Sequence, residues 1–261
     1  MRNLEVGPTI TEMSGYDPAS YGERIAPVYE EIHARLFAPE VVEPAVDCLA
    51  ELAGGGPVLE LGIGTGRIAL PLAERRVEVH GVDASEAMVA KLRAKPGGDR
   101  IPVTMGDFAT VPLEGDFSLI FVVFNTFFGL LTQNDQVACF QNSAAHLQTG
   151  GCFLIDAFVP DMNRIARGQH MGVISVGEDE IHLDVSRYDP IAQRSDASRL
   201  LISERGVKMY PVQIRWAWPS ELDLMAQLAG LRLRERWGGW KREPFGEESR
   251  RHVSVYEKSA T

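Results

Sequence analysis

The segment from Val58 to Arg67 constrains the fold of this chain most, because an apolar strand runs there directly into three alternating glycines. Glycine has no Cβ atom, so such a turn can bend sharply from strand to helix and let a ligand approach the backbone. Asp83 follows a second strand-like run, seventeen residues after Gly66. The dinucleotide fingerprint would need glycine or alanine at position 67, so nicotinamide or flavin binding is disfavoured.

Strand-like and helix-like segments alternate from residue 57 to residue 157, which predicts a parallel sheet covered by helices. A helix should start at the capping pair Thr132 and Asp135, and Gly150 and Gly151 should end it. The strands of this part are expected at 57–61, 77–82, 101–105, 119–124 and 152–157. The remaining helices and strands outside the middle region are expected at 16–37, 39–52, 219–229, 231–237 and 252–256.

The alternation of helices and strands stops after Pro160. Apolar residues alternate with polar ones from Ile181 to Val185, and two more strand-like runs lie at 199–203 and 210–216. Strict alternation is typical of strands with one buried face. This region therefore predicts an antiparallel meander laid over the parallel sheet.

The bulk composition excludes several classes of partner. The chain has 26 basic and 36 acidic residues and a formal charge of −10, which would repel a nucleic-acid backbone. No segment approaches the roughly 18 apolar residues of a membrane span, and the amino terminus is too polar for a secretory signal. Three scattered cysteines indicate neither disulfides nor a zinc site. We expect a cytoplasmic enzyme with a small-molecule substrate and no nucleic-acid or membrane partner.

The motif Glu60-x-Gly62-x-Gly64-x-Gly66, followed by Asp83 and Gly106-Asp107-Phe108, resembles that of the class I S-adenosylmethionine-dependent methyltransferases. The resemblance covers roughly residues 15–258. Stretches such as 124–128 and 158–161 look like those of small-molecule enzymes of antibiotic pathways, including amine N-methyltransferases.

This resemblance implies a Rossmann-like α/β fold with a seven-stranded, mostly parallel sheet, an N-terminal helical cap and an antiparallel β lid. It implies a cap at 1–53, a donor-binding domain at 54–160 and 217–261, and a lid at 161–216.

The family also implies that S-adenosylmethionine is the co-substrate and suggests which residues hold it. The glycine turn and Glu60 would hold the methionyl part, Asp83 both ribose hydroxyls, and Asp107 and Met88 the adenine. The expected donor-binding residues are Tyr16, Tyr21, Arg24, Glu60, Gly62, Gly64, Gly66, Asp83, Ala84, Met88, Gly106, Asp107, Phe108 and Phe124.

The preferred acceptor is an amine, because a neutral amine needs little more than positioning opposite the leaving sulfur. An alcohol or phenol needs a base or a metal ion. No metal is expected, since Asp156, Asp161 and Asn163 do not form the adjacent acid and amide of metal-dependent enzymes, and Asp161 can instead start a helix. The expected catalytic residues are Tyr16, Phe124, Asn125 and His170.

Arginines and aromatic rings could hold the charged groups of donor or acceptor. Arg24 or Arg215 could bind a carboxylate, and ring faces could hold a cationic amine. Two alternatives stay open: an O- or C-methyltransferase, and a non-catalytic protein that only binds the donor. A homodimer built through a lid strand is one option for the oligomeric state.

Overall fold

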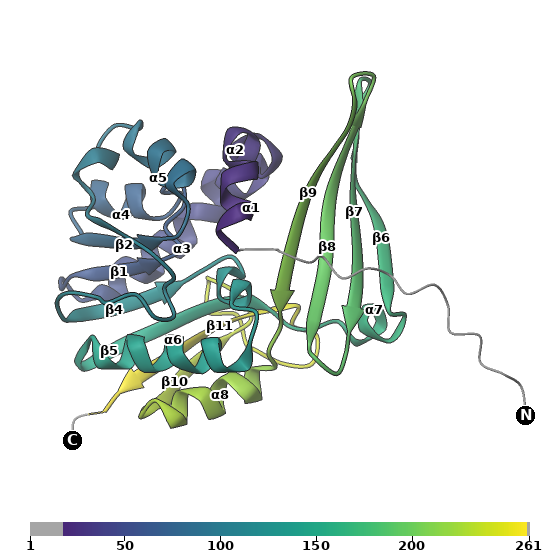
Figure 1. The fold of residues 1–261 in the computed structure, drawn as a ribbon. Helices are drawn as coiled ribbons and strands as arrows, with labels where there is room; N and C mark the ends of the chain where they lie inside the picture. Colours follow the sequence, from purple (N-terminus) through teal and green to yellow (C-terminus); the bar gives the residue numbers. More distant parts are fainter. Residues whose placement is uncertain (1–17, 260–261) are drawn as a thin grey trace, which may run out of the picture.

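A seven-stranded sheet forms the centre of the molecule in the computed structural model, which describes residues 18–259 (Figure 1). Its strands are β1 (Val58–Leu61), β2 (Val79–Asp83), β3 (Val103–Met105), β4 (Phe117–Val122), β5 (Leu147–Phe158), β10 (Leu231–Trp237) and β11 (Arg251–Lys258). They lie in the order β10-β11-β5-β4-β1-β2-β3. β11 pairs antiparallel with both β10 and β5, and all other pairs of the sheet are parallel. The predicted Rossmann-like fold with a mostly parallel sheet is confirmed.

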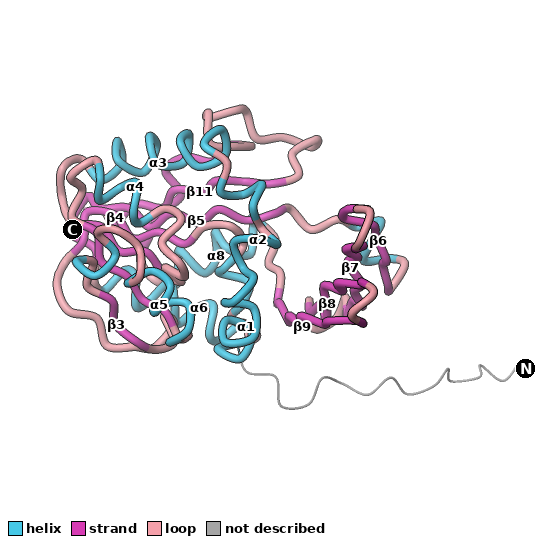
Figure 2. Tube along the Cα trace, turned by 90° about the horizontal axis from the view of Figure 1, so that it is seen from above, coloured by secondary structure: helices cyan, strands magenta, loops and turns pink. Residues whose placement is uncertain are grey.

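Helices cover both faces of this sheet, as the view along it shows (Figure 2). The helices packed on it are α3 (Pro39–Ala53), α4 (Ala69–Glu74), α5 (Glu86–Arg93), α6 (Gln133–Ala145) and α8 (Pro219–Leu228), with short 3-10 turns η3 (Gly98–Arg100) and η4 (Thr126–Gly129). The predicted capping pair starts α6, because the Thr132 hydroxyl accepts a hydrogen bond from the Asp135 amide at 3.1 Å.

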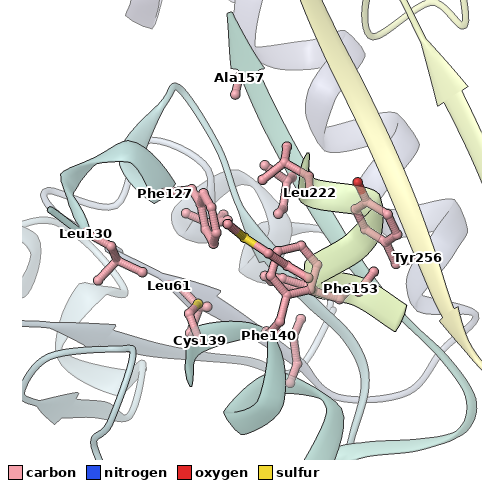
Figure 3. Packing of buried hydrophobic residues seen from close by; sticks show 14 of the residues in the cluster. Leu61, Phe127, Leu130, Cys139, Phe140, Phe153, Ala157, Leu222 and Tyr256 are labelled. Atoms are coloured by element: carbon pink, nitrogen blue, oxygen red, sulfur yellow. The ribbon is translucent and has the colours of Figure 1, made fainter. Parts of the chain in front are cut away.

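Alternate residues of the central strands point to opposite faces of the sheet and pack into two separate hydrophobic cores. Leu59 and Ile120 point to the core shared with α6 and α8, whereas Val58 and Phe121 point to the core beneath α3 and α4. Figure 3 shows the first core, where the ring of Phe140 lies edge-on to three other rings. Burial on both faces explains why these strands read as continuous apolar runs.

Two smaller units stand at the carboxyl ends of the parallel strands. The cap consists of α1 (Pro18–Ile25), η1 (Ala26–Val28), α2 (Tyr29–Ile32) and η2 (Ala34–Phe37). A second, antiparallel sheet consists of β6 (Gln169–Val176), β7 (Glu180–Asp189), β8 (Arg194–Ser203) and β9 (Gly206–Arg215), and helix α7 (Met162–Ala166) leads into it. We call residues 169–215 the wing.

The wing differs from the predicted lid in two respects. It has four strands where three were expected, and it stands beside the cap, which it contacts through β9, instead of lying over the central sheet (Figure 1). The first strand was missed because two apolar residues, Val173 and Ile174, follow each other in β6 where its ladder shifts register, so the alternation is broken. The division of the chain into domains at residues 53, 160 and 216 remains a prediction.

Gly150 and Gly151 do not end α6, which was the expectation. The helix ends at Ala145, and β5 already starts at Leu147. A Cβ atom at position 151 would lie 3.1 Å from the carbonyl oxygens of Phe117 and Ser118. The glycine therefore serves the close approach of β5 to β4, where the ladder shifts register.

Candidate active site

The glycine turn after β1 adopts the backbone that its sequence predicts. Gly62, Gly64 and Gly66 have φ angles of +73°, +55° and +81°, in the left-handed region that other residues adopt only under strain. A Cβ atom on Gly62 would lie 2.5 Å from Thr126, and one on Gly66 would lie 2.4 Å from Leu92. Around Gly64 the space is open, so the middle of the turn is the part that a ligand can approach.

Asp83 ties the end of β2 to this turn. One carboxylate oxygen accepts a hydrogen bond from the Gly64 amide at 2.7 Å, and the other accepts one from the Ser85 amide at 2.9 Å. Burial raises the pKa of this carboxyl above its ordinary value. A carboxylate has about four lone-pair sites, so each oxygen keeps an acceptor position for a hydroxyl group.

Glu60 and Arg67 lie beside the turn, and both have buried polar atoms without a partner. Oε2 of Glu60 and both Nε and Nη1 of Arg67 are buried without a hydrogen bond in the part of the chain that the structure describes. Burial, with Asp83 adding to it and Arg67 opposing it, raises the pKa of Glu60 to about 8. Buried polar atoms without a partner are costly, and they indicate a site where a polar ligand binds.

Phe124 holds the guanidinium of Arg67 in place. The centre of that guanidinium lies 3.5 Å from the centroid of the Phe124 ring, which is a close cation–π contact. Phe124 and Asn125 form a left-handed turn after β4, with φ angles of +56° and +68°. The buried Asp156, ion-paired with Arg251, stabilises this strained turn by accepting the Phe124 amide at 3.0 Å. The turn after β4 therefore belongs to the site, because its Phe124 ring contacts Arg67.

The second helix of the cap brings Tyr29 to the same site. Burial raises the pKa of Tyr29, and the charges of Asp83 and Glu60 add to this rise whereas the charge of Arg67 opposes it. His33 stacks on Tyr29 with ring centroids 4.6 Å apart and donates its Nδ1 proton to the Tyr29 carbonyl at 2.9 Å. Its Nε2 accepts a hydrogen bond of 3.2 Å from Arg199 of the wing.

The first helix of the cap is fastened to the start of α5. Gly22 lies so close that a Cβ atom there would be 2.5 Å from Ser85. Glu23 accepts hydrogen bonds from the Ser85 hydroxyl at 2.8 Å and the Ala87 amide at 3.1 Å. Tyr21 packs beside the buried Met88 in a small core that the cap shares with α5 and β9.

Most of the remaining expected donor-binding residues lie at the ends of β2 and β3. Gly106 and Asp107 follow β3, where the Asp107 carboxylate accepts the Ala109 amide at 2.8 Å, and Phe108 is half-buried beside them. Ala84 is exposed directly after Asp83. Tyr16 lies outside the described residues.

Three other side chains named from the sequence lie elsewhere. His170 is on β6, the edge strand of the wing opposite to β9, so the structure does not bring it to the glycine turn. Arg215 is buried in an ion pair with Glu221 at 2.7 Å, which leaves it no charge to offer a ligand. Arg24 is exposed on α1.

Three residues of the site were not predicted as such: Tyr29, Arg67 and Lys95. Lys95 pairs with Glu30 of the cap and donates to the Thr65 carbonyl in the turn at 2.7 Å. Arg67 had a signal in the sequence, because a charged residue follows the last glycine where the dinucleotide motif has a small one. Tyr29 and Lys95 had none, since both depend on how the cap folds back.

Two features bear on metals and membranes. The described residues contain no cluster of three histidine, cysteine or acidic side chains that could hold a metal ion. Asp161 caps α7 by accepting the Asn163 amide at 2.9 Å, as its position suggested. None of the helices between residues 18 and 259 is long and apolar enough to cross a bilayer.

Comparisons with known proteins agree with this geometry. Residues 58–151 match the methyltransferase domain family. The CcbJ methyltransferase from Streptomyces caelestis is 42% identical, with a TM-score of 0.88 over 94% of this chain and 100% of that chain. The cypemycin N-terminal methyltransferase of a Streptomyces species is 27% identical over 93% of this chain and 99% of its own length. The sugar N-methyltransferase KedS8 from Streptoalloteichus shares the fold, with a TM-score of 0.64 at 19% identity over 97% and 99% of the two chains.

The high identity to one solved methyltransferase over its whole length decides the family and the class of reaction. A non-catalytic donor-binding protein is thereby set aside. The left-handed glycine turn and the mostly parallel seven-stranded sheet match what the sequence resemblance implied. The chain belongs to the class I S-adenosylmethionine-dependent methyltransferases that act on small molecules.

Proposed function

We propose that this enzyme methylates an amine nitrogen of a natural-product intermediate. Two similar proteins carry names that point to nitrogen: an N-terminal methyltransferase acting on cypemycin and a sugar N-methyltransferase. The acceptors of those proteins are a peptide and a sugar, and what they share is an amine. An O- or C-methyltransferase is the competing assignment.

The donor fits the residues at the glycine turn. S-adenosylmethionine, when bound, supplies a methyl group on a positively charged sulfur. Its methionyl carboxylate would take the free Nε and Nη1 of Arg67, and its ammonium the free Oε2 of Glu60. Asp83 would accept the ribose hydroxyls, while Met88, Asp107 and Phe108 would enclose the adenine. The unpartnered atoms of both side chains would thus find hydrogen-bond partners, and the ammonium would favour the charged form of Glu60.

The observation that carries the choice of nitrogen is the state of His33, the histidine that stacks on Tyr29 of the site. Both of its ring nitrogens are engaged, with the Tyr29 carbonyl and with Arg199. Burial, with Arg199 and Arg67 adding to it, lowers the pKa of His33 to about 4. Such a group is a poor base for an alcohol or phenol. An amine that arrives neutral needs only orientation and a water-free site.

Phe124 and Asn125 are proposed as the residues that orient the acceptor. Asn125 Oδ1 accepts the Phe158 amide at 2.7 Å, so the side-chain amide group is held in a fixed direction with its N–H donors unspent on that bond. An aromatic ring such as Phe124 stabilises a nitrogen that becomes cationic as the methyl group arrives, by about 0.5–2 kcal/mol. The proposed roles of Tyr16 and His170 stay predictions from the sequence.

The proposal is tested with labelled donor and matched pairs of acceptors, in which one carries an amine and its analogue a hydroxyl group. We expect transfer to the amine only, with a rate that rises with pH through the pKa of the free amine and shows no further ionisation. Replacing His33 with glutamine, which keeps an acceptor for Arg199, should leave that pH profile unchanged. Faster transfer to the hydroxyl analogue, with an ionisation that His33→Gln removes, would overturn the nitrogen assignment.

A further inference from the structure

The wing exposes an unusual number of large apolar side chains. Six of them are Met171, Val173, Val176, Ile181, Val207 and Met209, with exposed fractions from 38% for Ile181 to 72% for Val176. They come from three of its strands and from both edges of the sheet. Singly exposed apolar residues are ordinary on a protein surface, whereas a continuous apolar patch indicates a binding surface.

The strand register places all six on one face. Residues opposite each other in an antiparallel ladder point to the same side of the sheet. The pairs run across the wing from Val173 to Leu183, from Leu183 to Leu200, and from Leu200 to Met209. A second row runs from Val176 through Ile181 and Ile202 to Val207. The exposed side chains therefore belong to one continuous apolar surface, which we call the outer face.

The opposite face of the wing is turned to the cap and carries its polar groups. Tyr210 and Leu201 pack there against the cap helices, and Arg199 reaches His33. The charged residues Asp184 and Lys208 alternate with the outer-face residues and so lie on this inner side. An antiparallel sheet with one solvated face normally has its polar side outward. In the wing the arrangement is reversed.

The outer face contains no charged side chain between residues 171–176, 181–185, 198–202 and 207–211, and Ser198 is its one polar residue. The whole chain, by contrast, carries a net charge of −10, so two copies repel each other over most of their surfaces. A neutral apolar surface is where such copies can meet without that repulsion, and a two-fold axis lets the same patch pair with itself.

We propose that the outer face of the wing binds the outer face of a second copy of this chain. The contact is between faces and not between edges, because the ladder of the edge strand β6 shifts register between Val173 and Ser175. Bulges of this kind protect an edge from pairing with another strand. This proposal concerns assembly and does not depend on which atom the enzyme methylates.

The size of the outer face sets the expected strength of the contact. Four strands about 4.8 Å apart and about six residues long cover about 400 Å² in projection. Side chains raised above the sheet add to this, so two copies would bury roughly the 1,000 Å² at which specific interfaces begin. We therefore expect a dimer that dissociates at micromolar concentrations.

Sedimentation velocity of the full chain across about 1–100 µM tests this proposal. The wild-type protein should reach twice the mass of one chain, or a higher even multiple. The double variant V173K/M209K brings four like charges into the contact and should weaken association at least tenfold. Leu228→Lys is the matched control, because Leu228 is 69% exposed on α8, outside the wing. It should assemble like the wild type.

Unchanged circular dichroism must accompany the loss of assembly in the double variant. Val207→Ser is a milder change that should weaken association in the same direction, and it decides the matter should the double variant fail to fold. A wild-type chain that stays monomeric at 100 µM would overturn the proposal. The outer face would then be covered by residues 1–17 or by another protein. Equal assembly of the wild type and the outer-face variants would overturn it as well.

Discussion

Two arginines, the half-buried Arg67 at the end of the central sheet and the buried Arg215 at the root of the wing, have opposite surroundings. Arg67 lies on an aromatic ring with two nitrogens unpartnered among the described residues. Arg215 is saturated by Gln136, Gln193 and Glu221, which join the wing to α6 and α8. The incomplete set indicates a ligand site, and the complete one a structural joint.

Replacing each arginine with methionine should separate these roles most clearly. Arg215→Met leaves Glu221 without its cation and should lower the free energy of unfolding by about 3–5 kcal/mol. Arg67→Met removes a half-buried charge that has no ion-pair partner among the described residues, so the fold should be as stable as the wild type or more so. Donor affinity should fall roughly 10- to 100-fold through the loss of a charged hydrogen bond worth about 1.5–3 kcal/mol. Urea unfolding and calorimetry with S-adenosylhomocysteine measure the two quantities. Full donor affinity in Arg67→Met would contradict the carboxylate assignment.

Substituting one glycine in the turn after β1 and one in the wing compares these two regions again, with a smaller expected effect on stability. Gly62→Ala, at φ +73°, places a Cβ atom 2.5 Å from Thr126. We expect the free energy of unfolding to fall by about 1–3 kcal/mol and donor binding to be lost. Gly206→Ala at the tip of the wing has φ +113° but no atom within 4 Å. It should cost about 1 kcal/mol and leave donor affinity unchanged. Similar donor affinities for the two variants would show that the turn tolerates displacement.

The contact between cap and wing should produce the smallest effect, and one that depends on pH. The pKa of His33 is about 4 in the folded protein against about 6.5 when unfolded, so the unfolded chain binds the proton first as pH falls. Stability is thus complete above pH 6.5 and declines toward pH 4. From pH 7 to pH 5 this amounts to about 1–2 kcal/mol.

Urea unfolding of His33→Gln at both pH values isolates this contribution. Burial also lowers the pKa of His252, to about 3, in the central sheet, so part of the decline must persist in the variant. An identical loss of unfolding free energy from pH 7 to pH 5 in the variant and the wild type would show that folding does not lower the pKa of His33.

The parts of the fold that local sequence patterns encode were predictable. Strands buried on both faces gave apolar runs, Thr132 and Asp135 gave a helix start, and the spaced glycines gave the left-handed turn beside Asp83. Each of these signals depends on neighbours a few residues apart. The strand β6 had no such signal, because the consecutive apolar residues Val173 and Ile174 break its alternation, and its pairing with β7 fixes its position.

The sequence by itself determined the sheet, the glycine bend after the first strand and the acid at the tip of the second strand, because backbone geometry and side-chain periodicity are local properties. Only the tertiary structure decided that Arg67 rests on Phe124, that Tyr29 enters the site, and that the apolar side of the wing faces outward. Those outcomes join segments between roughly 30 and 170 residues apart along the chain, where burial and charge pairing, and not local preference, select the arrangement.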